Sequence, residues 1–146
     1  MGVLVSNFEK SISYTQFNEQ IDAQGIQFGM KPETVFELLK DKPEEEMCVY
    51  GYEYMFEESG LNIGFRLNSD EVRRITVKNT YNSILSSFVG DTVESAKQNA
   101  LASGYVDDPT VKGRMNNESV YFTAVSKDGV VIDQLILEII DSEVLN

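Results

Sequence analysis

The chain contains two segments of similar sequence whose equivalent positions lie 61 residues apart. The first begins Gly29-Met30-Lys31-Pro32-Glu33-Thr34-Val35, and the second begins Gly90-Asp91-Thr92-Val93-Glu94-Ser95-Ala96. Further on, the strand-like run 72–77 corresponds to 132–137 at an offset of 60. Because the offset changes by only one residue over a whole unit, the match favours duplication over coincidence. Two related α+β units in one small chain are expected to build one continuous sheet.

Each unit is predicted to fold as a helix followed by a three-stranded meander. Pro32 suits the first turn of a helix, because its missing N–H is not needed there, and apolar residues follow it at helical spacing. Beyond the helices, apolar and polar residues alternate, as in strands with one buried face. The acidic run 44–46 is interpreted as a solvated link. The expected elements are helices at 32–40 and 92–102, and strands at 48–56, 61–68, 72–78, 110–115, 119–126 and 130–140.

The predicted fold class is therefore α+β, with two tandem helix–meander repeats that form one antiparallel sheet and pack their helices on one face. At 146 residues, the chain suits one compact domain or two half-domains that share a core. The expected organisation is an N-terminal segment (1–25), a first repeat (26–78), a linker (79–87), a second repeat (88–140) and a tail (141–146).

A row of aromatic residues, Tyr50, Tyr52, Tyr54 and Phe56, lies on one side of the first predicted strand. If exposed, this row would suit a protein interface, because aromatic residues dominate binding hot spots. If Phe56 pairs with Leu61, however, the tyrosines share a side with the apolar residues of the returning strand. We therefore expect this face to lie under the helices and to form core.

The opposite face of the sheet is expected to be polar and open, and it is the candidate surface for a partner. Its centre should hold Arg66, Arg74, Tyr121 and Thr123, with Glu53 close to Arg66 across the first hairpin. Arginine and tyrosine are residue types that often carry interface energy. Plain solvation of a sheet face also produces such a surface, so both interpretations stay open.

Charge and composition limit the kinds of partner. With 24 acidic and 12 basic side chains the net charge is −12, which disfavours nucleic acids and anionic membranes as partners. The charge is interpreted first as a well-solvated surface that favours solubility, and the alternative is that it steers a basic protein partner. No apolar run approaches the ~20 residues needed to cross a bilayer. No export signal is visible, and a lipid anchor upstream of the chain stays open. Cys48, the single cysteine, cannot form an internal disulfide and is expected to be an inert buried thiol.

The chain has no histidine, which removes the commonest general base and metal ligand and every Ser/His or Cys/His pairing. No phosphate loop, calcium loop or dinucleotide motif occurs. Adjacent acids such as Asp107-Asp108 lie at predicted turns, where solvated charge is the default. The chain is therefore predicted to be non-catalytic, with no cofactor and no metal. The alternative, a small carboxylate-dependent enzyme, would need two acids with opposed pKa values in one cleft.

The segment Ile26-Gln27-Phe28-Gly29-Met30, followed by Lys-Pro-Glu-Thr-Val, resembles the repeat-opening segment of the β-lactamase inhibitory protein family, and 90–96 is a weaker second instance. In that family two tandem helix–sheet units form a saddle whose concave sheet face clasps another protein, and small outer-membrane-assembly lipoproteins use a single related unit. The inhibitor carries a disulfide in each unit and this chain has one cysteine, so no inhibitory residue is carried over.

The resemblance implies a protein-binding module of a bacterial envelope or secreted protein, which uses its open sheet face. An inhibitor or immunity-type protein that blocks a basic enzyme is an alternative. A plain structural domain of a larger envelope protein is another, because a shared fold does not fix a function.

Overall fold

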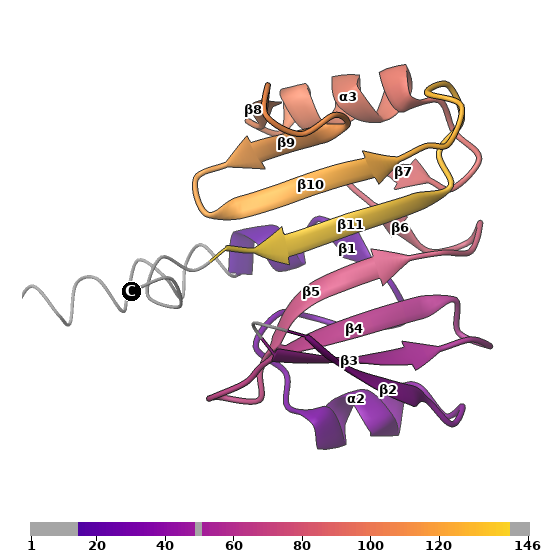
Figure 1. The fold of residues 1–146 in the computed structure, drawn as a ribbon, viewed down its shortest axis with the longest axis vertical. Helices are drawn as coiled ribbons and strands as arrows, with labels where there is room; N and C mark the ends of the chain where they lie inside the picture. Colours follow the sequence, from indigo (N-terminus) through magenta and orange to yellow (C-terminus); the bar gives the residue numbers. More distant parts are fainter. Residues whose placement is uncertain (1–14, 49–50, 141–146) are drawn as a thin grey trace, which may run out of the picture.

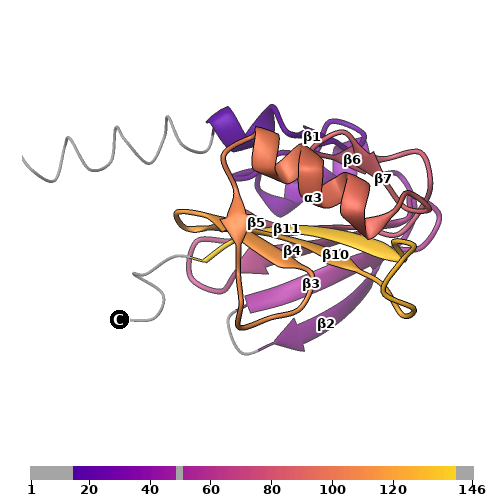
Figure 2. The same ribbon diagram turned by 90° about the horizontal axis from the view of Figure 1, so that it is seen from above.

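The computed structural model describes residues 15–48 and 51–140. They form an α+β structure that is mostly antiparallel sheet (Figures 1 and 2). A large sheet has the strand order β2-β3-β4-β5-β11-β10-β9-β8, and a small sheet has the order β1-β6-β7. The elements are β1 (Ile21–Asp22), α2 (Pro32–Leu38), β2 (Glu44–Cys48), β3 (Gly51–Phe56), β4 (Leu61–Arg66), β5 (Val72–Val77), β6 (Ser83–Ile84), β7 (Ser87–Phe88), α3 (Val93–Ala102), β8 (Val106–Asp107), β9 (Arg114–Asn117), β10 (Val120–Val125) and β11 (Gln134–Ile139).

The strand order of the large sheet follows the two similar segments of the sequence. Strands β2 to β5 follow α2 and fill one side of the sheet, whereas β8 to β11 follow α3 and fill the other side in reverse order. The last strand of each side, β5 and β11, pair at the centre, with Thr76 opposite Ile136 (Figure 1). In the small sheet, Asp22 lies opposite Ser83.

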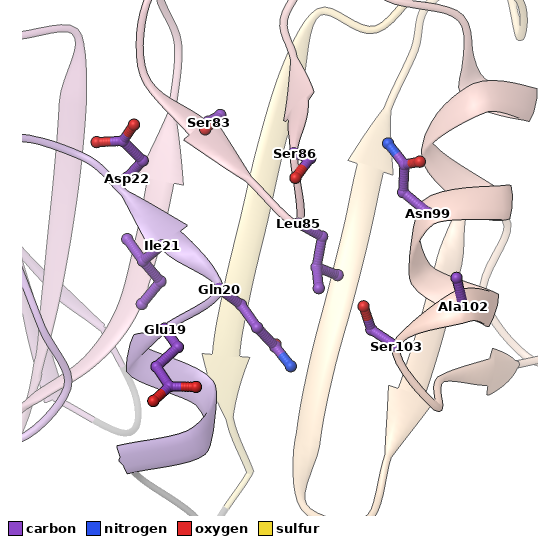
Figure 3. A pocket seen from close by; sticks show the side chains of 10 residues that line it. All are labelled: Glu19, Gln20, Ile21, Asp22, Ser83, Leu85, Ser86, Asn99, Ala102 and Ser103. Carbon is purple, nitrogen blue, oxygen red and sulfur yellow. The ribbon is translucent and has the colours of Figure 1, made fainter.

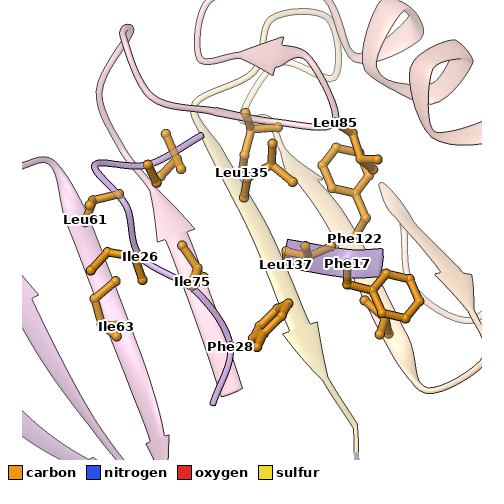
Figure 4. Close-up of a cluster of buried hydrophobic side chains, with 14 of the residues drawn as sticks. Phe17, Ile26, Phe28, Leu61, Ile63, Ile75, Leu85, Phe122, Leu135 and Leu137 are labelled. Carbon is orange, nitrogen blue, oxygen red and sulfur yellow. The ribbon is translucent and has the colours of Figure 1, made fainter. Parts of the chain in front are cut away.

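The helices and the small sheet lie on the same face of the large sheet. Figure 2 shows α3 and the small sheet above this face, and α2 packs there through Phe36, which contacts Tyr54 with ring centroids 5.1 Å apart. The hydrophobic core fills the space between the two layers (Figure 4). It includes Phe17, Ile26, Phe28, Leu61, Ile63, Ile75, Leu85, Phe122, Leu135 and Leu137, all buried.

The first hairpin has the register that the sequence predicted. The pairs are Phe56–Leu61, Tyr54–Ile63 and Tyr52–Phe65. Tyr52 stacks on Phe65 with centroids 5.3 Å apart, and both Tyr52 and Tyr54 pack against the core. The interpretation of this face as core is therefore confirmed for these two tyrosines, whereas Tyr50 lies outside the described residues. The side chain of Cys48 also lies outside them.

The acidic run 44–46 was predicted to be a solvated link. It is instead the start of an edge strand, β2, which pairs with β3. With β2 and the short strand β8, each side of the large sheet has four strands where three were expected. Glutamates are poor strand formers by propensity, but they suit an edge strand, since their charge discourages pairing with another chain. The prediction failed because it took charge as a sign of a link.

Several strands are shorter than predicted because side chains hold the neighbouring turns. Before β9, Asp108 accepts hydrogen bonds from the N–H and the hydroxyl of Thr110 and keeps 108–113 out of the sheet. Before β11, Asp128 accepts from the N–H groups of Val130 and Val131. The prediction of a single sheet was incomplete, because β1, β6 and β7 form a second, small sheet. The segment 79–87, which was predicted to be a linker, contains one of its strands, β6.

Backbone hydrogen bonds and positive φ angles recur at the offset of about 61 residues that the sequence shows. The N–H of Gly29 donates to the carbonyl of Val72 at 3.0 Å, and the N–H of Gly90 donates to the carbonyl of Ile132 at 2.9 Å. Positive φ angles recur at the same spacing, at Gln24 (57°), Gly25 (85°) and Gly29 (89°) and again at Leu85 (52°), Ser86 (60°) and Gly90 (98°). Equivalent positions therefore adopt equivalent backbone conformations in the two halves.

We expect Gly51→Ala to lower the free energy of unfolding by about 2 kcal/mol or more, because overpacking at backbone is relieved only by moving strands. A Cβ at Gly51 would lie 1.9 Å from the carbonyl oxygen of Phe65 on the paired strand. The matched control is Gly90→Ala, which has a φ of 98° but no atom within 4 Å of the added Cβ, and should cost only about 1 kcal/mol of backbone strain. Urea unfolding measures both, and equal losses would contradict the steric explanation.

Candidate functional site

One row of residues crosses the open face of the large sheet near its centre. Cross-strand pairing places Glu53, Gly64, Arg74, Glu138 and Tyr121 in succession on β3, β4, β5, β11 and β10. Their neighbours along each strand are mostly core residues, so alternation directs this row away from the helices. The structure thus brings three of the five predicted site residues into one line.

Arg74 lies between two carboxylates in this row. Its Nη1 is 3.9 Å from Glu53 Oε2, and its Nε is 3.7 Å from Glu138 Oε2. Gly64 stands between Glu53 and Arg74, and a Cβ there would lie 3.0 Å from the Cβ of Arg74. The side chain of Arg74 is 35% exposed, so these long ion pairs contribute little to stability. Both distances exceed hydrogen-bond range, and Nε of Arg74 is buried without a hydrogen-bond partner among the described residues.

The ring of Tyr121 is in contact with the guanidinium group of Arg114, a residue that was not among the predicted site residues. The guanidinium carbon of Arg114 lies 4.4 Å from the centre of the Tyr121 ring, a cation–π contact. Arg114 Nε in turn donates to Asp108 Oδ2 at 2.8 Å. Hydrogen bonds from the hydroxyl and N–H of Thr110, and then from Arg114, lower the pKa of Asp108 to about 2. Asp108 therefore anchors the arginine that fixes Tyr121.

The two other predicted residues lie on the same face, beside the central row. Thr123 lies between Ile136 and Arg114 in the pairing of β11, β10 and β9. Arg66 is opposite Gly51 at the end of β4. The sequence placed Glu53 close to Arg66; in the register the two are diagonal neighbours, and Glu53 forms an ion pair with Arg74.

All four arginines of this acidic chain lie in strands of the large sheet, whereas the described lysines all lie outside strands. The arginines are Arg66 in β4, Arg73 and Arg74 in β5, and Arg114 in β9. Arginine differs from lysine in its planar, multiply donating group, which suits fixed contacts at interfaces. The sequence-based strands 72–78 and 110–115 contain Lys78 and Lys112, so this segregation appears only with the strand bounds of the structure.

A groove with a volume of about 460 Å³ lies at the junction of β1, the β6–β7 turn and α3 (Figure 3). The sequence analysis did not predict it, because its lining comes from three distant segments. The lining residues are Glu19, Gln20, Ile21, Asp22, Ser83, Leu85, Ser86, Asn99, Ala102 and Ser103. Its size is within the range of small-ligand sites.

Within residues 15–48 and 51–140, no three Cys, Asp or Glu side chains come together in a way that could hold a metal ion. The described helices include none that is both long and apolar enough to cross a membrane. The predicted acidic pair at 107–108 lies beside β9, where Asp108 is engaged with Arg114.

Comparisons with known proteins give one structural likeness. No protein-family model matches the chain, and no curated protein matches its sequence. Among solved structures, the chain is similar to an extracellular protein containing a SCP domain from Bacillus anthracis str. Ames, with a TM-score of 0.60 and 11% identity. The match covers 80% of this chain and 45% of the solved one, so the chain spans less than half of that protein. At this identity the likeness concerns the fold alone.

Asp108 should make stability depend on pH in the acid range. Its pKa is lowered from the ordinary 3.8 to about 2 in the folded state, so its contribution is fully present above about pH 4 and is lost as pH falls toward 2. Asp108→Asn should therefore flatten the fall in unfolding free energy over that range, measured by urea unfolding at several pH values.

The neighbouring Asp107 offers the control for this pH dependence, because its carboxylate makes no hydrogen bond or ion pair with the described part of the chain. Asp107→Asn should keep the wild-type slope. If Asp108→Asn also keeps that slope, Asp108 is not the group that responds.

Proposed function

We propose that this chain is a non-catalytic protein-binding module and that a partner protein docks on the open face of the large sheet. The observation that carries the proposal is the row in which Arg74 lies between two carboxylates and Tyr121 packs against the Arg114 guanidinium group. Side chains that are ordered before binding lose less conformational entropy on docking. Arginine and tyrosine are also the residue types most often found at interface hot spots.

The face also has the mechanical properties of a docking platform. Continuous antiparallel pairing from β2 to β8 fixes the positions of the side chains on it, so binding needs no rearrangement of loops. Thr76 and Ile136 are opposite each other at its centre and are buried, although strand alternation directs them away from the helices. A partner would therefore meet mainly the polar row, since Thr76 and Ile136 are only 3% and 8% exposed.

The platform is proposed to consist of two tandem repeats of one unit, each a helix followed by a meander. Support comes from the order of elements and from the hydrogen bonds of Gly29 and Gly90, which recur at the sequence offset. The pair Thr76–Ile136 joins positions that are equivalent at offset 60, and the pair Asp22–Ser83 joins positions equivalent at offset 61. Such self-equivalent antiparallel pairs are expected on a two-fold axis between the halves.

We also propose a secreted or cell-envelope setting. The solved neighbour is described as extracellular, and the segment 26–30 resembles the repeat opening of the β-lactamase inhibitory protein family, whose members clasp proteins with a two-unit sheet. The strongly acidic charge makes a protein a better partner than a nucleic acid. A partner patch that presents basic groups beside aromatic groups would complement Glu53, Glu138 and Tyr121.

The test begins with a photo-crosslinking residue at Thr123, which lies beside Arg114, to capture the partner from the native source. Its affinity is then measured for the wild type and for Arg74→Ala with Tyr121→Ala. We expect the double variant to bind at least about 30-fold more weakly, equivalent to about 2 kcal/mol, because two ordered anchor groups are lost.

The matched control removes one basic and one tyrosine side chain on the helix side, Lys40→Ala with Tyr81→Ala, both exposed. This variant should bind within about twofold of the wild type. Both double variants are first checked for unchanged cooperative unfolding. Equal affinity of the open-face variant and the wild type would show that the partner docks elsewhere.

A further inference from the structure

We propose that a cavity between α3 and the strands β9 and β10 binds a single aromatic ring. The cavity has a volume of about 190 Å³. It lies on the side of the large sheet that α3 covers, so it is separate from the open face (Figure 2). Figure 1 shows α3 beside β9 at one end of the sheet and α2 at the opposite end, beside β2 and β3.

Two aromatic rings that the chain itself supplies fill the corresponding space at the α2 end. Tyr54 on β3 lies opposite Ile63 on β4. The ring of Tyr54 contacts the ring of Phe36 on α2 edge to face, with centroids 5.1 Å apart. At this end, the helix and the sheet therefore meet through a pair of rings.

At the α3 end, a glycine and a lysine hold the positions of these two rings. At offset 61, Ala124 corresponds to Ile63, and Lys97 corresponds to Phe36. The N–H of Ala124 donates to the carbonyl of Gly113 at 3.0 Å, so Gly113 lies opposite Ala124 and takes the place that the α2 end gives to a tyrosine. Both Gly113 and Lys97 line the cavity. Since neither residue carries a ring, the space between helix and sheet stays open.

The backbone prevents a larger side chain from closing the cavity at the sheet. Gly113 has a φ of 82°, and a Cβ there would lie 2.7 Å from the carbonyl oxygen of Ala124. On the helix, the ammonium group of Lys97 makes no hydrogen bond or ion pair with the described part of the chain, so nothing there fixes this side chain across the cavity.

The apolar part of the lining suits an aromatic ligand. It consists of Val93, which is half-buried, and of Met115, Phe122 and Ala124, which are buried. A methionine sulfur and a phenylalanine ring both make favourable contacts with an aromatic ring, beyond the gain from burial of apolar surface.

The size and the charges of the cavity fit the same class of ligand. An apolar cavity of about 150 Å³ takes up benzene, so a volume of about 190 Å³ has room for one six-membered ring. The charged lining residues are of both signs, Glu94 and Asp107 against Lys97, and therefore give little preference for a charged ligand. The ring, and not a charge, is expected to carry the binding.

Two sources of the ring are considered, the phenylalanine side chain of a peptide and a free small aromatic molecule. The probes are Nα-acetyl-phenylalanine methylamide and toluene, with Nα-acetyl-cyclohexylalanine methylamide as the non-aromatic analogue. Binding is followed by the ¹³C-labelled methionine methyl signals of the full chain, because the ring current of a bound aromatic ring shifts the methyl signal of Met115. The methyl signals of Met30, Met47 and Met55 serve as internal controls, since these residues do not line the cavity.

We expect a saturable shift of the Met115 signal with at least one aromatic probe, and the probe that binds more tightly identifies the source. The cyclohexyl compound, measured by competition, should bind at least about threefold more weakly, because its ring lacks the aromatic quadrupole.

Three variants test the position of the site. Lys97→Phe places a ring where α2 carries Phe36, and should weaken binding of the preferred probe at least about tenfold because it fills the cavity. Lys97→Gln removes the same charge without adding a ring, and Lys40→Phe adds the same ring at an exposed lysine beyond the end of α2. Both controls should change binding less than about twofold. All three variants are first checked for cooperative unfolding.

Three outcomes would overturn the proposal. The first is the absence of a Met115 shift with either aromatic probe, or shifts of equal size at all the methionine methyl groups. The second is equal affinity for the cyclohexyl compound and the aromatic probes. The third is equal binding by Lys97→Phe and Lys97→Gln, which would place the ligand outside this cavity.

Discussion

The pairing of β5 with β11 is the interaction on which the rest of the structure depends. It joins two four-stranded sides into one sheet and places Ile75, Val77, Leu135 and Leu137, all fully buried, at the centre of the core. Burial of one such side chain contributes about 1.5–3 kcal/mol. The same pairing sets Arg74 opposite Glu138, so the arrangement of the open face is a consequence of the central seam.

The outer edges of the sheet are protected in a different way from its centre. At one edge, β2 begins with three glutamates, all exposed, and at the other edge β8 has only two residues. Charge and shortness both discourage the addition of a strand from another molecule. The described edges of the large sheet are thus poorly suited to pairing with a strand of another protein. A partner protein is therefore expected to contact a face of the sheet rather than an edge.

Residues 24–29 and 85–90 have positive φ angles at the same spacing, but the side chains around the two segments differ. In the first half, Ser59 collects hydrogen bonds from Gln24, Asn79 and Asn82 and ties the β3–β4 turn to the small sheet. In the second half, the equivalent region is the groove beside Ala102. One half is therefore closed by a hydrogen-bonded cluster, and the other offers a concave polar surface on the same framework.

The sequence by itself determined the features that depend on residues close together along the chain. Helical spacing of apolar residues specified both helices, and two-residue alternation specified the first hairpin and the buried face of Tyr52. The two-residue strands of the small sheet escaped prediction because so short a segment carries no periodic pattern.

Only the tertiary structure decided which distant residues meet. Glu53 reaches Arg74 across Gly64, and Arg114 covers Tyr121. The groove combines residues from 19–22, from 83–86 and from the C-terminal end of α3. Alternation specifies the face on which a side chain lies, but its cross-strand neighbours depend on strand order and register. Those are fixed by the burial of the whole core, which no local segment of the sequence encodes.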